Sequence, residues 1–110
     1  MKKIKSFEDA CLKLGKNPKG KYHPHERLEI IIAAIVGKWK ADYNNSDQEK
    51  WYCIFRWDAS SSCFRFRYSY YDCTNARACS GVRLSMQTEA QADYVGKTFE
   101  AEFDALLQRK

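Results

Sequence analysis

The chain has 110 residues and a net charge of +5. This length is typical of one domain, which buries about two-thirds of its unfolded surface without needing disulfides or a metal. The amino terminus has lysines but no apolar run behind them, and no stretch reaches the roughly twenty apolar residues of a membrane span. The sequence therefore predicts a single-domain cytoplasmic protein, residues 1–110, without membrane contact.

The first helix is predicted just after the amino terminus. Ser6 is a suitable N-cap, the apolar residues of 7–14 recur at helical spacing, and Gly15 provides the stop. Pro24 is well placed as the first residue of a second helix that runs to about Gly37. This second helix has little polar face, which predicts that it is the central buried helix.

The basic residues are concentrated in this first part of the chain. Residues 1–40 contain ten lysines and arginines against four acidic residues, whereas residues 41–110 contain nine against ten. The loop between the two helices holds Lys16, Lys19 and Lys21. Such a patch suits an acidic partner such as nucleic acid, although a solubilising surface is the more common reason for a charge of this size.

A connector of residues 39–50 leads into a predicted β-sheet. Trp51–Trp57 is the first strand, residues 58–62 form a turn, and Cys63–Tyr71 is the second strand. After a loop, Val82–Met86 is predicted as a short third strand. The sheet is expected to be antiparallel because a short turn joins its first two strands.

A third helix ends the chain. Thr88 and Gln91 form a capping box, and apolar residues recur at helical spacing from there to Leu106. Gly96 interrupts this stripe and predicts close approach of another element. The sequence thus predicts an α+β fold of three helices packed on a small three-stranded antiparallel sheet, in the order α-α-β-β-β-α.

The predicted hairpin has the most distinctive composition in the chain. Residues 51–71 hold nine of its sixteen aromatic residues, together with Arg56, Arg65 and Arg67. Strict alternation along the second strand predicts that one face carries Phe64, Phe66, Tyr68 and Tyr70 and the other carries Arg65, Arg67 and Ser69. Core positions are expected for Phe64, Phe66 and Tyr68, while Trp51, Trp57 and Tyr71 stay open between core and surface.

The cysteines are odd in number, lack a C-x-x-C pair and accompany no export signal, which predicts that they are reduced. Cys11 and Cys53 fall at apolar positions and are expected in the core. Cys73 and Cys79 fall in the predicted loop, and only these two are expected to react quickly with thiol reagents.

No motif for catalysis or metal binding stands out. His23 and His25 supply only two metal ligands, and the spacing between Cys73 and Cys79 is wider than in structural zinc sites. The chain has no G-x-G-x-x-G, P-loop or H-E-x-x-H motif. Acidic residues of the last helix, including Glu100, are explained as a solvated face. We therefore expect no enzyme activity, no metal and no cofactor.

Several segments resemble a family of short proteins. They are SFEDACLKLG, GKWKADYNNSDQEKWYCIF, SGVRLSM and AQADYVGKTFEAEFDALL. The matching positions are Trp39, Asp42, Tyr43, Asn44, Ser46, Gln48, Lys50, Trp51, Gly81, Arg83, Leu84, Tyr94, Gly96, Lys97 and Phe99. The family is encoded by gut Bacteroidales and their phages or mobile elements, and its members commonly have proline where this chain has Ala41. The resemblance implies a phage or mobile-element origin and no particular activity.

Two basic regions are candidates for nucleic-acid binding. Aromatic faces stack on the bases of a single strand while arginines and lysines bind its phosphates. The candidate residues are Trp51, Arg56, Trp57, Arg65 and Arg67 on the hairpin, and Lys16, Lys19 and Lys21 in the first loop. These residues predict a non-enzymatic phage or mobile-element accessory protein that prefers single strands.

Two other functions stay open. The alternative is an interaction module that modulates a host protein, such as a defence component, and a weaker possibility is capture of a small nucleotide-like ligand. The first strand also has bulky residues on both faces. We expect a partner to cover one of them, which predicts a homodimer or larger assembly.

Overall fold

The computed structural model describes residues 3–42, 44–45, 47–72 and 84–108. In this part of the chain the elements are α1 (Phe7–Leu14), α2 (Pro24–Val36), β1 (Lys50–Asp58), β2 (Cys63–Asp72), α3 (Glu89–Thr98) and α4 (Glu100–Gln108). The α+β prediction is confirmed. The predicted count is wrong, because the described residues form four helices and a two-stranded antiparallel sheet.

The first two helices begin and end where the sequence predicts. The side chain of Ser6 accepts a hydrogen bond of 3.1 Å from the backbone N–H of Asp9, and Gly15 ends α1 with φ +71°. Pro24 is the first residue of α2, whose start is also held by a 3.1 Å bond from the His23 backbone N–H to the Glu26 carboxylate. The amino termini of both helices thus have side-chain partners for backbone N–H groups that would otherwise stay unpaired.

In the described part of the predicted third strand, residues 84–86, one bridge forms. Val82 and Arg83 lie outside the described residues, and Leu84 forms no strand pair. Met86 alone pairs, exchanging backbone hydrogen bonds of 2.9 and 2.8 Å with Trp51. The short apolar alternation was therefore too brief a signal to establish a strand.

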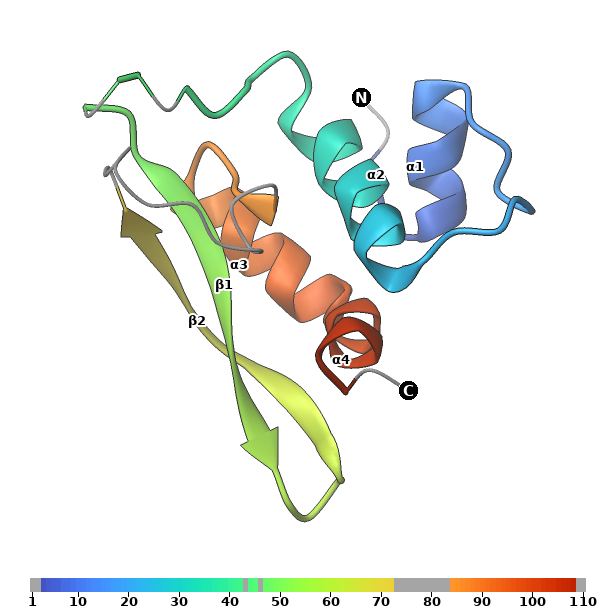
Figure 1. The fold of residues 1–110 in the computed structure, drawn as a ribbon, viewed down its shortest axis with the longest axis vertical. Coiled ribbons are helices and arrows are strands. Elements are labelled where there is room, and N and C mark those ends of the chain that lie inside the picture. The colour runs from blue at the N-terminus through green and yellow to red at the C-terminus, as the bar shows by residue number, and fades with distance from the viewer. Residues whose placement is uncertain (1–2, 43, 46, 73–83, 109–110) are drawn as a thin grey trace.

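The predicted last helix is two helices. Phe99 leaves the helical region with φ −111° and ψ 30°, and α4 starts at Glu100 in a new direction (Figure 1). The side chain of Phe99 stays buried at this corner. No glycine or proline marks the break, so apolar periodicity alone suggested one continuous helix.

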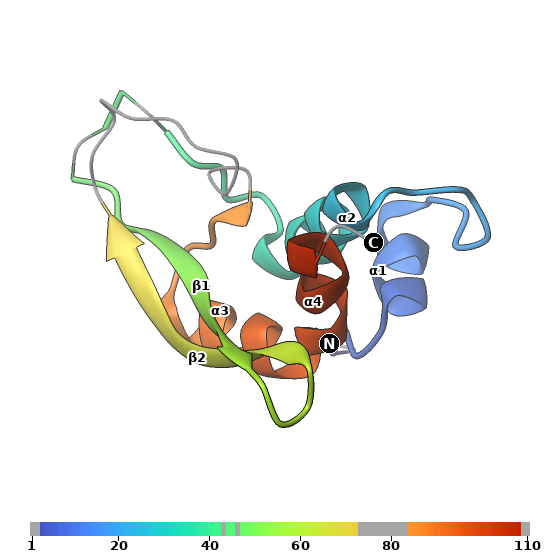
Figure 2. The same cartoon turned by 60° about the horizontal axis from the view of Figure 1, so that its bottom comes forward.

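The elements form layers with the hairpin at one side. β1 and β2 pack on α3 and α4, α2 packs behind α4, and α1 packs on α2 (Figures 1 and 2). The predicted central position of α2 is confirmed by its buried Leu28 and Ile31. None of the described helices has the length and apolarity that crossing a membrane requires.

One ion pair joins three of the helices. On α2, the Nε and Nη2 atoms of Arg27 donate hydrogen bonds of 2.8 and 2.7 Å to the two carboxylate oxygens of Glu102 on α4. The guanidinium also lies 3.9 Å from the ring centre of Phe7 on α1. Such two-pronged pairing fixes orientation as well as distance.

Candidate nucleic-acid interface

A β-bulge determines which hairpin side chains share a face. Ile54 pairs with Tyr68, but the next residue, Phe55, pairs with Phe66. Arg67 is therefore the extra residue of a bulge in β2. Because one extra residue reverses the alternation beyond it, Phe66 and Tyr68 point to opposite faces of the hairpin.

The inner face is the one that packs on α3 and α4. On β1, the ring centre of Phe55 lies 4.5 Å from that of Phe103 on α4. Beyond the bulge on β2, Ser69 donates a 2.6 Å hydrogen bond from its hydroxyl to Asp93 on α3. These contacts place the side chains of even-numbered β1 residues on the opposite face.

We call the side of the hairpin that faces away from α3 and α4 the outer face. Side chains alternate between the two faces along each strand, and the contacts of the inner face fix which residues lie there. The residues of the outer face are therefore Tyr52, Ile54, Arg56, Arg65, Tyr68 and Tyr70. The exposed fraction is 49% for Tyr68 and 57% for Tyr70. In both views α3 and α4 lie on the other side of the strands (Figures 1 and 2).

The predicted distribution of aromatic residues on β2 is partly wrong. Phe64 and Phe66 are half-buried on the inner side, but Tyr68 and Tyr70 lie on the outer face with Arg65. Tyr68 is not a core residue. The bulge is the physical reason, since strict alternation would have kept all four rings together.

Three arginines lie around a hollow near the hairpin turn. The hollow has a volume of about 370 Å³ and is lined by Arg56, Trp57, Asp58, Ala59, Arg65, Phe66 and Arg67. Arg56 and Arg65 are direct cross-strand partners, an arrangement of like charges that destabilises a hairpin. The Nε of Arg65 lies 3.0 Å from Glu100, whereas the side chains of Arg56 and Arg67 have no hydrogen bond or ion pair with any described residue.

The carboxylate of Asp58 also borders this hollow, but its hydrogen bonds are directed to the turn. It accepts bonds from the hydroxyls of Ser60 at 2.7 Å and Ser61 at 2.9 Å. These bonds are the main reason that the pKa of Asp58 is lowered from its usual value. A lowered pKa keeps Asp58 ionised. Even with Asp58 beside the hollow and Glu100 paired with Arg65, the three arginines leave an excess of positive charge, which suits an anionic group.

The two predicted tryptophans occupy different places. Trp51 is half-buried against the core on the inner side, with its ring centre 5.0 Å from that of Tyr71. Trp57 is 48% exposed, lines the arginine hollow and contacts Phe64 edge-on at 5.2 Å. Only Trp57 lies beside the arginines, and neither tryptophan belongs to the outer face, because both are odd-numbered residues of β1.

The predicted lysine loop is separate from the hairpin. Lys16, Lys19 and Lys21 are exposed between α1 and α2. Figure 1 shows this loop at the opposite side of the molecule from β1 and β2. The two basic regions therefore do not form one continuous site.

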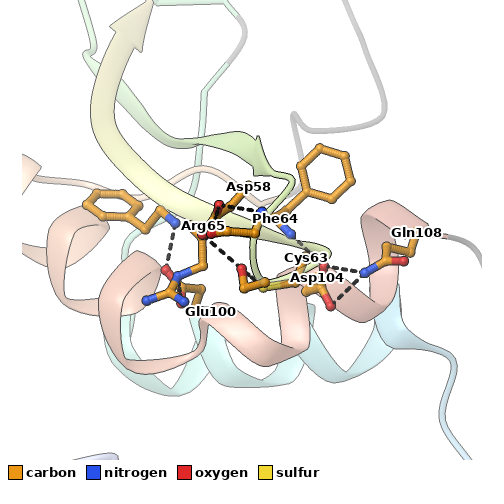
Figure 3. Close-up of polar contacts among 10 residues, drawn as sticks. Asp58, Cys63, Phe64, Arg65, Glu100, Asp104 and Gln108 are labelled. Atoms are coloured by element: carbon orange, nitrogen blue, oxygen red, sulfur yellow. Dashed lines mark hydrogen bonds and ion pairs between the residues drawn. The ribbon is translucent and has the colours of Figure 1, made fainter.

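Acidic residues of α4 bind the edge of β2. Glu100 and Asp104 each accept a 2.7 Å hydrogen bond, from the backbone N–H of Phe66 and Phe64 respectively (Figure 3). The side-chain amide of Gln108 donates to Asp104 at 2.8 and 3.0 Å. The expectation of a merely solvated acidic face is wrong for these residues.

The structure describes three of the five cysteines, Cys11, Cys53 and Cys63. Cys11 is buried, as predicted, and Cys53 is half-buried with its thiol donating 3.2 Å to the Ala92 carbonyl. Burial raises the pKa of Cys53 to about 12, so this thiol is a poor nucleophile. Cys73 and Cys79 lie outside the described residues, which also contain no group of three potential metal ligands.

Comparison with models of protein families, with curated proteins and with solved structures finds no match to this chain. The features of this chain that bear on its function are therefore the outer face and the arginine hollow. The resemblance to proteins of Bacteroidales phages and mobile elements stays a prediction.

Proposed function

We propose that this protein binds single-stranded nucleic acid on the outer face of the hairpin and catalyses no reaction. The observation that carries the proposal is the combination of exposed tyrosines and arginines on one face. Tyr68 and Tyr70 are exposed there, and the side chain of Arg56 has no hydrogen bond or ion pair with any described residue. These are the two kinds of group that hold a single strand.

The tyrosines supply surfaces for stacking. A base stacked on an aromatic ring contributes about 1–3 kcal/mol whatever its sequence. Tyr68 and Tyr70 are two residues apart on one strand, so both rings are available to one nucleic-acid chain. A duplex already stacks its bases on one another, which favours a single strand on this surface.

The arginine hollow supplies the phosphate contacts. Placing Arg56 directly opposite Arg65 destabilises the free hairpin, and Arg67 adds a third positive charge nearby. Glu100 balances only Arg65. A bound phosphate would balance the others and offset this repulsion, which is the behaviour expected of residues retained for binding.

A fluorescence anisotropy titration with labelled 12-nucleotide DNA and RNA strands tests this proposal. We expect Tyr68→Ala to weaken binding by about 1–3 kcal/mol. The double change Arg56→Gln and Arg67→Gln should reduce the slope of log K against log salt by about 1.4, given about 0.7 for each phosphate contact to a single strand.

The lysine loop offers a control with matched charge. Lys16→Gln with Lys19→Gln also removes two positive charges, but from the opposite side of the molecule. If this pair weakens binding as much as the arginine pair, and Tyr68→Ala has no effect, the loop is the site. Circular dichroism should confirm that every variant is folded.

The same exposed rings support one other function. Tyrosine and arginine are enriched in protein interfaces, so the outer face is also suited to a partner protein of the host. Failure of the wild-type protein to bind any strand at low salt would exclude the nucleic-acid proposal and leave this alternative. In either case the predicted context is an accessory protein of a phage or mobile element.

A further inference from the structure

The backbone of β1 has an edge that faces away from β2. On β2, the N–H groups of Phe64 and Phe66 point away from β1, because they donate to carboxylates of α4. In an antiparallel pair, two directly opposite residues either both direct their backbone N–H and C=O groups toward each other or both direct them away from each other. The partners of these residues, Trp57 and Phe55, therefore direct their own backbone groups away from β2.

At the other end of β1, a third segment occupies this edge for one residue. Trp51 exchanges two backbone hydrogen bonds with Met86. Every second residue of a strand points the same way, so Cys53 continues the outward row from Trp51 to Phe55. Among the described residues, no hydrogen bond reaches the outward backbone groups of β1 beyond the bridge.

The two edges of the hairpin are thus treated differently. The edge of β2 near the turn is covered by Glu100 and Asp104. The open segment of β1 contains no proline and no charged side chain at its three outward positions, Cys53, Phe55 and Trp57. Natural proteins usually protect a free edge of this kind, and an unprotected edge is a template for another strand.

We propose that the open edge of β1 pairs with the same edge of a second copy of this chain, antiparallel and about a two-fold axis at Phe55. Met86 limits the free segment at one end and the hairpin turn limits it at the other. Phe55 is the midpoint of the three outward positions between these limits, Cys53, Phe55 and Trp57. Centring the axis there places Cys53 opposite Trp57 of the second copy.

This register is compatible with the charges and faces of the hairpin. Arg56 falls opposite Ile54 of the second copy, so no arginine meets an arginine across the new strand pair. A two-fold axis perpendicular to the sheet keeps the helices of both copies on one side. The two outer faces then form one four-stranded surface. The inference rests on edge geometry and is independent of what that surface binds.

Sedimentation velocity between 5 and 200 µM gives the first test. We expect a species near twice the 12.9 kDa mass of one chain. Trp57→Pro removes one outward N–H without touching a bond between β1 and β2, and should yield a folded monomer. Trp57→Thr loses the same indole but keeps the N–H and should stay dimeric.

Several results would overturn the inference. A wild-type protein that stays at the mass of one chain up to 200 µM excludes the dimer. If the proline and threonine variants associate equally, pairing through the β1 edge is excluded. If both variants lose association, edge pairing is also excluded, because the indole of Trp57 would then be responsible.

A cross-linking experiment tests the register if the proline variant fails to fold. In a Cys63→Ser background, prolonged oxidation should link Trp57→Cys to the native Cys53 of the second copy, because directly opposite residues lie within bonding distance and this proximity offsets the low reactivity of the Cys53 thiol. The matched control, Arg56→Cys, places its thiol on the outer face and should form no bond to Cys53. Peptide mass spectrometry identifies the linked pair, and linkage of the control instead would contradict this register.

Discussion

Gly96 lies where α3 touches the hairpin, and its replacement by alanine tests that contact most sharply. A Cβ atom at this position would lie 2.2 Å from Cδ1 and 2.4 Å from Cε1 of Phe66. The close approach predicted from this glycine is confirmed. Alanine in an exposed helix gains about 1 kcal/mol over glycine, whereas an extra methyl group in a packed site costs about 1–3 kcal/mol. Because the overlap with Phe66 is severe, we expect Gly96→Ala to lower the free energy of unfolding by about 2 kcal/mol.

Urea denaturation followed by circular dichroism measures this loss, and a double-mutant cycle assigns its cause. Phe66→Val deletes the ring atoms that the new methyl group would meet, while keeping a residue that favours strands. In that background Gly96→Ala should gain about 1 kcal/mol, which gives a coupling of about 3 kcal/mol. If Gly96→Ala stabilises the wild-type chain, α3 and β2 do not approach each other as described.

Two further predictions concern buried contacts. Arg27→Met should lower the free energy of unfolding by about 1–2 kcal/mol, since it leaves the carboxylate of Glu102 without its partner and a third of the Arg27 side chain is exposed. Arg27→Lys should lose less, and equal stability of all three proteins would contradict this role. Cys53 should react with thiol reagents at pH 8 more slowly than Cys63. Burial raises the pKa of Cys53 from 9.0 to about 12, so the folded protein favours the neutral thiol. The contribution of this group to the free energy of unfolding is complete below pH 9 and is lost as the pH rises towards 12. Cys53→Ala should reduce that loss of stability at high pH.

Local signals in the sequence predicted the start of the fold well. Ser6, Gly15 and Pro24 act through their own side chains or backbone preferences, so the ends of α1 and α2 could be predicted without knowing the rest of the molecule. The hairpin could be predicted from its two runs of aromatic residues around a serine-rich turn. Arg65 likewise lies on the face opposite Phe64 and Phe66, as the alternation predicted.

The errors arose where tertiary contacts decide. The bulge at Arg67 leaves no mark in an alternating sequence, yet it moves Tyr68 and Tyr70 to the outer face. The turn at Phe99 depends on burying that ring between helices, and it allows Glu100 to reach the edge of β2. Neither could be predicted from periodicity, because both are set by partners distant in the sequence.

The carboxylates that α4 places on β2 have a consequence for self-assembly. A sheet that can add a strand at both edges grows without limit, and the end product is a fibre. Here Glu100 and Asp104 already take up the amide groups of β2 nearest the turn, so further copies find no donors at those positions. Growth through the hairpin is thereby directed to its other edge, where a two-fold pairing uses up the available groups and ends the assembly at two chains.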